Sequence, residues 1–195
     1  MSDINKLIEG CINGDSLSQE NVYKIFYKQM LGVCMRYSGD WDEAKDTLQE
    51  SFIKIFSKIK DYDGTGPFGG WVRRVVVNTN IDKIRGRKKK DYLETVNIET
   101  LFISNGKDVE EEIDVDDYMN ISKEDIMTAV QSLSPACRTI FNMHLVDGFS
   151  HKQISEKLNI NEGTSKSNLH KAKLKLRSIL LKNIKTKKDE STLHI

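Results

Sequence analysis

The sequence predicts an all-α protein built from two helical modules joined by a flexible acidic linker, and three observations support this prediction. The 195-residue chain holds only two prolines, the residues that most often interrupt helices, and its apolar residues recur at helical spacing. With 38% hydrophobic and 30% charged residues, it can bury a core and still expose a highly charged surface. Its length suits one ordinary domain or two small ones. The third observation is the distribution of charge.

Charge is arranged in three blocks, although the formal net charge is only +1. Residues 71–90 contain eight basic residues and one acid, and residues 162–188 contain nine basic residues and one acid. Between these blocks, residues 91–125 contain twelve acids and two lysines. Either basic block alone also fits a solvated helix face, but two of them favour binding to a polyanion such as nucleic acid. Self-repulsion and weak periodicity predict a linker at 91–122, and therefore modules at 18–90 and 123–184.

The N-terminal module is expected to begin with two amphipathic helices. The helix predicted over 18–39 places four apolar residues at core spacing: Val22, Phe26, Met30 and Val33. In the next helix, over 40–62, the residues predicted to face inward are Ala44, Leu48, Phe52, Ile55, Phe56 and Ile59. The start of this helix is acidic and polar, through Asp42, Glu43, Asp46, Gln49 and Glu50. Acids suit a helix N-terminus, so this patch has either that local role or a role in docking a basic protein partner.

A glycine-rich loop, DGTGPFGG at 63–70, precedes the third predicted helix. It lacks the Lys-Ser/Thr of a nucleotide-binding phosphate loop, so mobility or shaping of a pocket for an unstacked base is the better interpretation. One stripe of the helix that follows carries Trp71, Arg74, Asn78, Asp82 and Arg85. An aromatic ring with arginines suits single-stranded nucleic acid, because bases stack on the ring while cations hold the backbone. A core role for Trp71 is the alternative.

The C-terminal module has the pattern of a helix-turn-helix. Ser134 and Pro135 suit the start of one helix, Ser150 and Gln153 have capping-box spacing at the start of the next, and a turn is expected at 159–161. The basic amphipathic helix that follows is predicted to enter a major groove with residues near its start. The predicted DNA contacts are Thr164, Lys166, Ser167, Asn168, His170 and Lys171, whereas His144 is expected to be a packing residue.

Several function classes are not supported by the sequence. The three cysteines are widely spaced without a C-x-x-C pair, and there is no carboxylate cluster or nucleophile arrangement, so we predict no metal, no cofactor and no enzymatic activity. Reduced, buried thiols fit a cytoplasmic protein. No apolar run approaches the roughly 20 residues that span a bilayer, so no membrane insertion is expected.

Three stretches together carry a family resemblance: DEAKDTLQESFIKIF at 42–56, GPFGGWVRRVVVNTNIDKIRGRKKK at 66–90, and LSPACRTIFNMHLVDGFSHKQISEKLNINEGTSKSNLHKAK at 133–173. In this order they resemble the extracytoplasmic-function group of bacterial sigma factors. The resemblance implies core RNA polymerase and promoter DNA as partners, with a possible anti-sigma factor. It also implies promoter-specific transcription initiation with melting at the minus-ten element.

The resemblance also implies a role for each predicted surface. The residues implied to bind the polymerase clamp are Asp46, Gln49, Glu50 and Phe52. The stripe from Trp71 to Arg85 matches the minus-ten segment of sigma region two, and the helix from Thr164 to Lys173 matches the minus-thirty-five recognition helix of region four. Asn168 stands where the family often has Arg, and asparagine favours adenine over guanine. A stand-alone helix-turn-helix regulator is the alternative, but it leaves the acidic patch and the Trp71 stripe without a role.

Overall fold

The computed structural model describes residues 3–86 and 121–192, and every regular element in these ranges is a helix. This confirms the predicted all-α class. The chain divides into two compact units, with the boundary after Gly86, and each unit is described by itself. Apart from its last two residues, the predicted linker at 91–122 lies outside the described residues, as do the basic residues 87–90.

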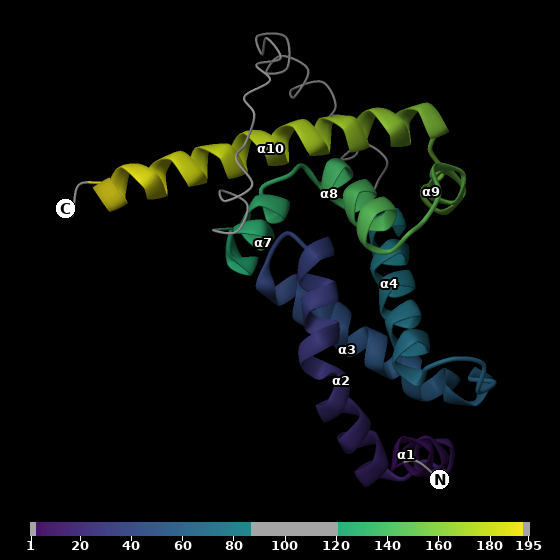
Figure 1. The fold of residues 1–195 in the computed structure, drawn as a ribbon. Helices are drawn as coiled ribbons and strands as arrows, with labels where there is room; N and C mark the ends of the chain where they lie inside the picture. The colour runs from purple at the N-terminus through teal and green to yellow at the C-terminus, as the bar shows by residue number, and fades with distance from the viewer. Residues whose placement is uncertain (1–2, 87–120, 193–195) are drawn as a thin grey trace. The chain divides into compact units, whose positions relative to one another are not determined.

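The N-terminal unit is a bundle of three longer helices with a short helix packed at one end (Figure 1). Its elements are α1 (Asp3–Ile12), α2 (Ser16–Tyr37), α3 (Trp41–Lys58), the 3-10 helix η1 (Ile59–Asp61) and α4 (Phe68–Gly86). Helices α2, α3 and α4 pack against one another, and α1 packs on α2 and η1. Fully buried core residues include Val22, Met30, Val33, Leu48, Ile55, Val72 and Val76. The sequence predicted all three longer helices and the inward faces of α2 and α3.

Short-range caps define where α2 and α3 begin. The Asp15 carboxylate accepts a hydrogen bond from the Ser18 amide at 2.8 Å, and the Asp40 carboxylate accepts one from the Glu43 amide at 2.8 Å. Each bond satisfies an amide that the first helical turn leaves without a partner. Helix α1, by contrast, was not predicted from the sequence. Near its end, Gly10 lies so close to α2 that a β-carbon there would overlap the Ser18 side chain.

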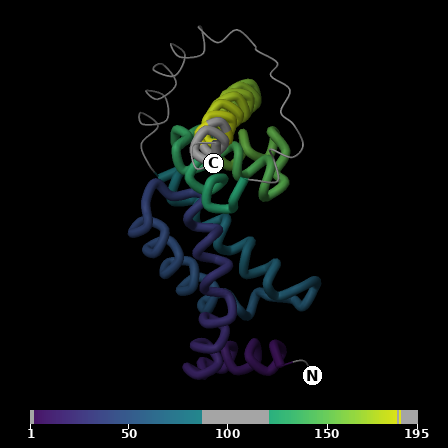
Figure 2. Tube along the Cα trace, turned by 60° about the vertical axis from the view of Figure 1, so that its left-hand side comes forward, coloured from purple at the N-terminus to yellow at the C-terminus, as the bar shows by residue number. Residues whose placement is uncertain are grey.

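The C-terminal unit is built around one long helix. Its elements are α7 (Lys123–Gln131), α8 (Pro135–Phe141), the π-helix η2 (Asn142–Val146), α9 (His151–Leu158) and α10 (Glu162–Thr192). Helix α10 contacts α7, α8 and α9, which stay beside it in both views (Figure 2). One cluster of its core consists of Ala129, Val130, Leu133, Cys137, Ala172 and Leu176. All three cysteines of the chain are buried and form no disulfide, as predicted.

Candidate functional site

Helix α3 presents an acidic, polar face to solvent. Asp46, Gln49 and Glu50 are all exposed, and their spacing of three and four residues puts them on one side of the helix. The Glu43 carboxylate accepts a hydrogen bond from the Gly39 amide at 2.9 Å, so this acid is used in the helix cap. Glu50 pairs with Lys54 at 2.7 Å, an exposed pair that contributes little to stability. The predicted polymerase-binding acids are thus available at the surface.

Phe52 lies beneath this face rather than on it. Its side chain is 3% exposed, and its ring packs against Tyr23 and Phe56 with centroids 4.6 and 5.9 Å away. Phe52 is therefore removed from the set of surface contacts that the resemblance implied. Its neighbour Ile53 is 70% exposed and follows Gln49 and Glu50 on the same face of α3. Sequence reasoning missed Ile53, although the wheel that turned Phe52 inward also turns Ile53 outward.

Side chains of the glycine-rich loop between η1 and α4 form hydrogen bonds with the loop's own backbone. The Tyr62 hydroxyl donates to the Gly66 carbonyl at 2.6 Å, and the Asp63 carboxylate accepts from the Thr65 amide at 2.9 Å. Bonds from the Thr65 hydroxyl and amide lower the pKa of Asp63. Gly64 and Gly66 have φ of +78° and +90°, a region that favours glycine. These contacts favour the interpretation of the loop as a shaped base pocket over that of a mobile segment.

Aromatic rings join this loop to the start of α4. Trp71 stacks on Phe68 with centroids 5.7 Å apart and planes 17° from parallel, and Tyr62 contacts both rings. Phe68 is buried, whereas Trp71 and Tyr62 are half-buried. Trp71 thus has features of both a core residue and a base-stacking residue, since its ring packs on Phe68 and still has exposed surface. An aromatic surface of this kind can accept a stacked base.

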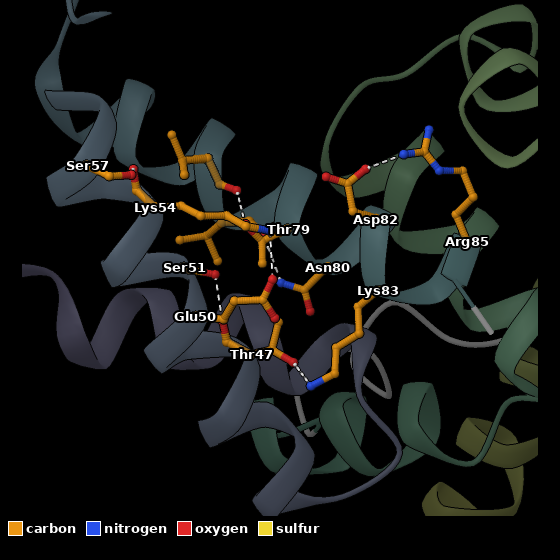
Figure 3. A network of polar contacts seen from close by, with 12 residues as sticks. Thr47, Glu50, Ser51, Lys54, Ser57, Thr79, Asn80, Asp82, Lys83 and Arg85 are labelled. Atoms are coloured by element: carbon orange, nitrogen blue, oxygen red, sulfur yellow. Dashed lines mark hydrogen bonds and ion pairs between the residues drawn. The ribbon is translucent and has the colours of Figure 1, made fainter. Parts of the chain in front are cut away.

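The remaining residues of the α4 stripe continue along the helix from Trp71. Arg74, Asp82 and Arg85 are exposed and Asn78 is half-buried, so the predicted stripe exists as one accessible face. Arg85 pairs with Asp82 at 3.0 Å (Figure 3). This pair is exposed and weak, so the guanidinium can exchange the carboxylate for a phosphate at small cost.

A polar contact ties α4 to α3. The Lys83 ammonium donates to the Thr47 hydroxyl at 3.0 Å (Figure 3), and the Thr47 hydroxyl donates to the Glu43 carbonyl at 2.8 Å. On the next face of α4, the buried Asn80 amide donates to the Val76 carbonyl at 2.9 Å and approaches the sulfur of Cys34 on α2 at 3.5 Å. These contacts join α4, which carries the stripe, to α3, which carries the acidic face, and to α2.

The turn between α9 and α10 has the geometry of a helix-turn-helix. Ser150 and Gln153 form both bonds of the predicted capping box, at 3.2 and 2.9 Å. Asn159 ends α9 in the left-handed conformation with φ of 54°, and the Ile160 amide donates to the Ser155 carbonyl at 3.1 Å. Asparagine tolerates this conformation better than most residues. The tight turn places the start of α10 directly after α9.

Five of the six predicted minus-thirty-five residues are accessible on α10. Lys166, Ser167 and His170 are exposed, and Thr164 and Lys171 are half-buried. Asn168 is different, because its side chain is only 4% exposed and its oxygen lies 3.7 Å from the Cys137 sulfur on α8. It lies three residues after buried Ser165 and four before Ala172, which places all three on the inner face. This burial argues against the predicted base contact by Asn168.

The described residues contain no group of three or more His, Cys, Asp or Glu side chains that could hold a metal ion. Among the same residues, no helix is long and apolar enough to cross a bilayer.

Both units match known sequence families. Residues 22–90 match the family Sigma-70 region 2, and residues 123–176 match the family Sigma-70, region 4. The chain is 28% identical over 184 residues to the ECF RNA polymerase sigma factor SigW of Bacillus subtilis, covering 91% of this chain and 96% of that protein. It is 30% identical over 155 residues to the RNA polymerase sigma factor SigV of the same organism, covering 80% and 83%.

Among solved structures, the chain is similar to the sigma factor RpoE in its complex with the anti-sigma factor NepR from Bartonella quintana. The TM-score is 0.47 at 19% sequence identity, covering 83% of this chain and 95% of that one.

Proposed function

Because the chain belongs to the ECF group of RNA polymerase sigma factors, which direct promoter-specific transcription initiation, we propose a division of that task among the surfaces described above. In this proposal the acidic face of α3 docks on core RNA polymerase, the α4 stripe reads and opens the minus-ten element, and the start of α10 reads the minus-thirty-five element. The corresponding modules are residues 18–90 and 123–184, joined through 91–122.

Docking on the polymerase is assigned to Asp46, Gln49 and Glu50 with Ile53 beside them. The acids supply attraction to a basic partner surface and fix register, which favours fast and specific association. Ile53 supplies the apolar contact that exposed acids cannot, because burying an isoleucine side chain contributes roughly 1.5–3 kcal/mol. The proposal thus keeps three of the four predicted residues and replaces Phe52 with its exposed neighbour.

Opening of the minus-ten element is assigned to the aromatic surface of Tyr62 and Trp71 and to the α4 stripe. A base that leaves the duplex stack can stack on the exposed part of the Trp71 ring, a contact worth about 1–3 kcal/mol. Phe68 supports that ring from behind, and the loop bonds of Tyr62 keep the surface formed before DNA arrives. Arg74 and Arg85 are proposed to hold the strand's phosphates, while Asn78 and Asp82 offer polar groups to the bases.

Reading of the minus-thirty-five element is assigned to Thr164, Lys166, Ser167, His170 and Lys171. The N-terminal part of a recognition helix contacts base edges in the major groove, while lysines further along meet the backbone. With Asn168 in the core, base discrimination falls to the shorter set formed by Ser167, His170 and the adjacent lysines.

In this proposal the chain carries out no bond chemistry itself, since the polymerase performs nucleotide transfer. The chain is proposed to act in the cytoplasm. An anti-sigma factor is a further proposed partner.

The observation that carries this proposal is the coexistence, in one chain and in family order, of an accessible aromatic and basic stripe on α4 with a helix-turn-helix. Purified full-length protein would be added to sigma-free bacterial core polymerase with fragmented genomic DNA, and transcript starts sequenced. Discrete starts that depend on the protein and share two upstream motifs at fixed spacing are the expected result. The stand-alone regulator would instead retain duplex fragments without polymerase and start no transcripts.

A further inference from the structure

Two histidines, His144 and His151, lie face to face beside the first turn of α10, and the proposed promoter contacts leave both unused. Their ring centroids are 4.3 Å apart, and their planes differ by 14°. His144 belongs to the π-helix η2, whereas His151 is the first residue of α9. Both side chains are half-buried, so each ring has surface that solvent or a ligand can reach.

Hydrogen bonds determine where these rings can take up a proton. Nδ1 of His144 lies 2.8 Å from the carbonyl oxygen of Phe149, which only accepts, so Nδ1 carries the hydrogen and Nε2 is the site for a second proton. Nδ1 of His151 lies 2.9 Å from the hydroxyl of Ser165 on α10. That hydroxyl donates to the neutral ring or accepts from the charged one. Either ring can therefore become charged while its hydrogen bond is kept.

The charged groups around His151 are mainly basic. It stacks on His144 of η2, and Lys166, Glu162 and Lys173 of α10 are near enough to act on its charge. Burial lowers the pKa of His151, His144 and Lys166 lower it further, and Glu162 opposes them. An anionic group that approached the ring would reverse this balance, because an opposite charge within about 4–6 Å favours the charged form.

We propose that His144 and His151 form a contact for a DNA phosphate at the edge of the minus-thirty-five face, and that binding of upstream DNA takes up a proton on this pair. The inference rests on the proposed function of α10. Ser165, the partner of His151, is itself buried, but its neighbour Lys166 is exposed on that face, so a phosphate held by Lys166 would lie near the pair. Two stacked charged rings repel each other, so the pair accepts one proton rather than two.

The sign of the effect follows from linkage. DNA raises the affinity of the pair for a proton, so a proton must raise the affinity of the pair for DNA by the same factor. Affinity for the upstream element is therefore expected to rise as the pH falls from about 8 to about 6, the range in which histidine titrates. One linked proton changes affinity by at most a factor of about ten per pH unit.

The test uses holoenzyme assembled from the full-length chain and two lengths of a promoter found by start-site mapping. One fragment contains the upstream motif, and the other ends just downstream of it. The ratio of their affinities, measured by competition at constant ionic strength from about pH 8 to about pH 6, reports what the upstream element adds. The variants are His144→Gln, His151→Gln and His151→Lys, and thermal unfolding checks that each one folds.

For the unaltered chain the ratio should rise toward low pH, and each Gln variant should flatten that rise. His151→Lys carries a fixed charge and should hold the ratio near its acid value at every pH. The ratio is the affinity for the longer fragment divided by that for the shorter one. If it is above one but does not change with pH, or rises as steeply in both Gln variants as in the unaltered chain, this inference is overturned and the minus-thirty-five assignment stands. A ratio of one at every pH overturns both.

Discussion

Replacing Ile53 with Ala is expected to weaken binding to core RNA polymerase about tenfold without unfolding the N-terminal unit. The Ile53 side chain is 70% exposed, so most of its apolar surface is available to a partner. Full burial of an isoleucine contributes roughly 1.5–3 kcal/mol, and this exposed share corresponds to about 1–2 kcal/mol. Since about 1.4 kcal/mol is a factor of ten, Kd should rise roughly five- to thirtyfold.

Phe52→Ala provides the contrast, because this neighbouring ring is 3% exposed and packs on Tyr23 and Phe56. Removing it leaves a cavity and should lower the free energy of unfolding by about 3–5 kcal/mol. Denaturant unfolding followed by tryptophan fluorescence measures this, since Trp41 and Trp71 both lie in the N-terminal unit and report on it alone. The same measurement should show Ile53→Ala within about 0.5 kcal/mol of the unaltered chain.

Titration of labelled full-length protein with core polymerase gives the Kd, and Ile25→Ala is the matched control. Ile25 is also an exposed isoleucine, 54% accessible, but it lies on α2 rather than on α3. Its replacement should leave the Kd unchanged. Equal affinities for Ile53→Ala and Ile25→Ala would refute the reasoning, and so would loss of stability in Ile53→Ala comparable to that of Phe52→Ala.

Three further predictions concern other parts of the chain. Asn168→Arg should destabilise the C-terminal unit by about 3 kcal/mol or more, because it buries a charge, whereas Ser167→Ala should change DNA affinity only. Amide hydrogen exchange in α10 measures the destabilisation and should be faster in Asn168→Arg. Unchanged exchange would mean that the side chain at 168 is exposed. Trp71→Ala should make promoter opening less favourable by up to the roughly 1–3 kcal/mol of a stacked base, which should reduce the reactivity of unpaired minus-ten thymines to permanganate. Unchanged reactivity would exclude the Trp71 ring as a stacking surface. The pKa of Asp15 is lowered by bonds from Ser18, so its contribution to stability is present above its ordinary value of 3.8 and lost as pH falls through the lowered value. Asp15→Ala should accordingly lower Tm at neutral pH, with the difference vanishing in acid.

Features set by neighbours in sequence were predictable. The capping box of Ser150 and Gln153 needs only three residues of separation, and the inward residues of α2 and α3 follow from a period of 3.6. Phe52 shows how two sources of inference differ, because periodicity turned it inward while the family resemblance put it among the contacts. The structure agrees with periodicity, since the Phe52 ring is buried against Tyr23 and Phe56, whatever the role of the matching residue in other members of the family.

Features that depend on packing between distant residues were not predictable. Helix α1 is short, and short helices depend on packing for their stability; it packs on α2 and on η1, which lies far away in the sequence. Asn168 lies on a helix whose inner face begins with a serine, Ser165, rather than an apolar residue. The pattern of apolar residues alone would start the buried face at Leu169, one turn too late. Stacking of His144 on His151 likewise needed the fold of the π-helix between α8 and α9.

The contact between Lys83 and Thr47 has a consequence for how the N-terminal unit works. It joins the helix proposed to dock on polymerase to the helix proposed to open DNA, through a bond of 3.0 Å in a half-buried position. Thr47→Val keeps the shape of the side chain but removes the acceptor, which leaves the Lys83 ammonium partly desolvated without this bond. A small rotation of α4 against α3 should follow. Because the C-terminal unit has a core of its own, this variant should impair opening at the minus-ten element while the affinity gained from the upstream element stays unchanged. Equal loss of both activities would mean that Thr47 acts on the stability of the whole chain instead.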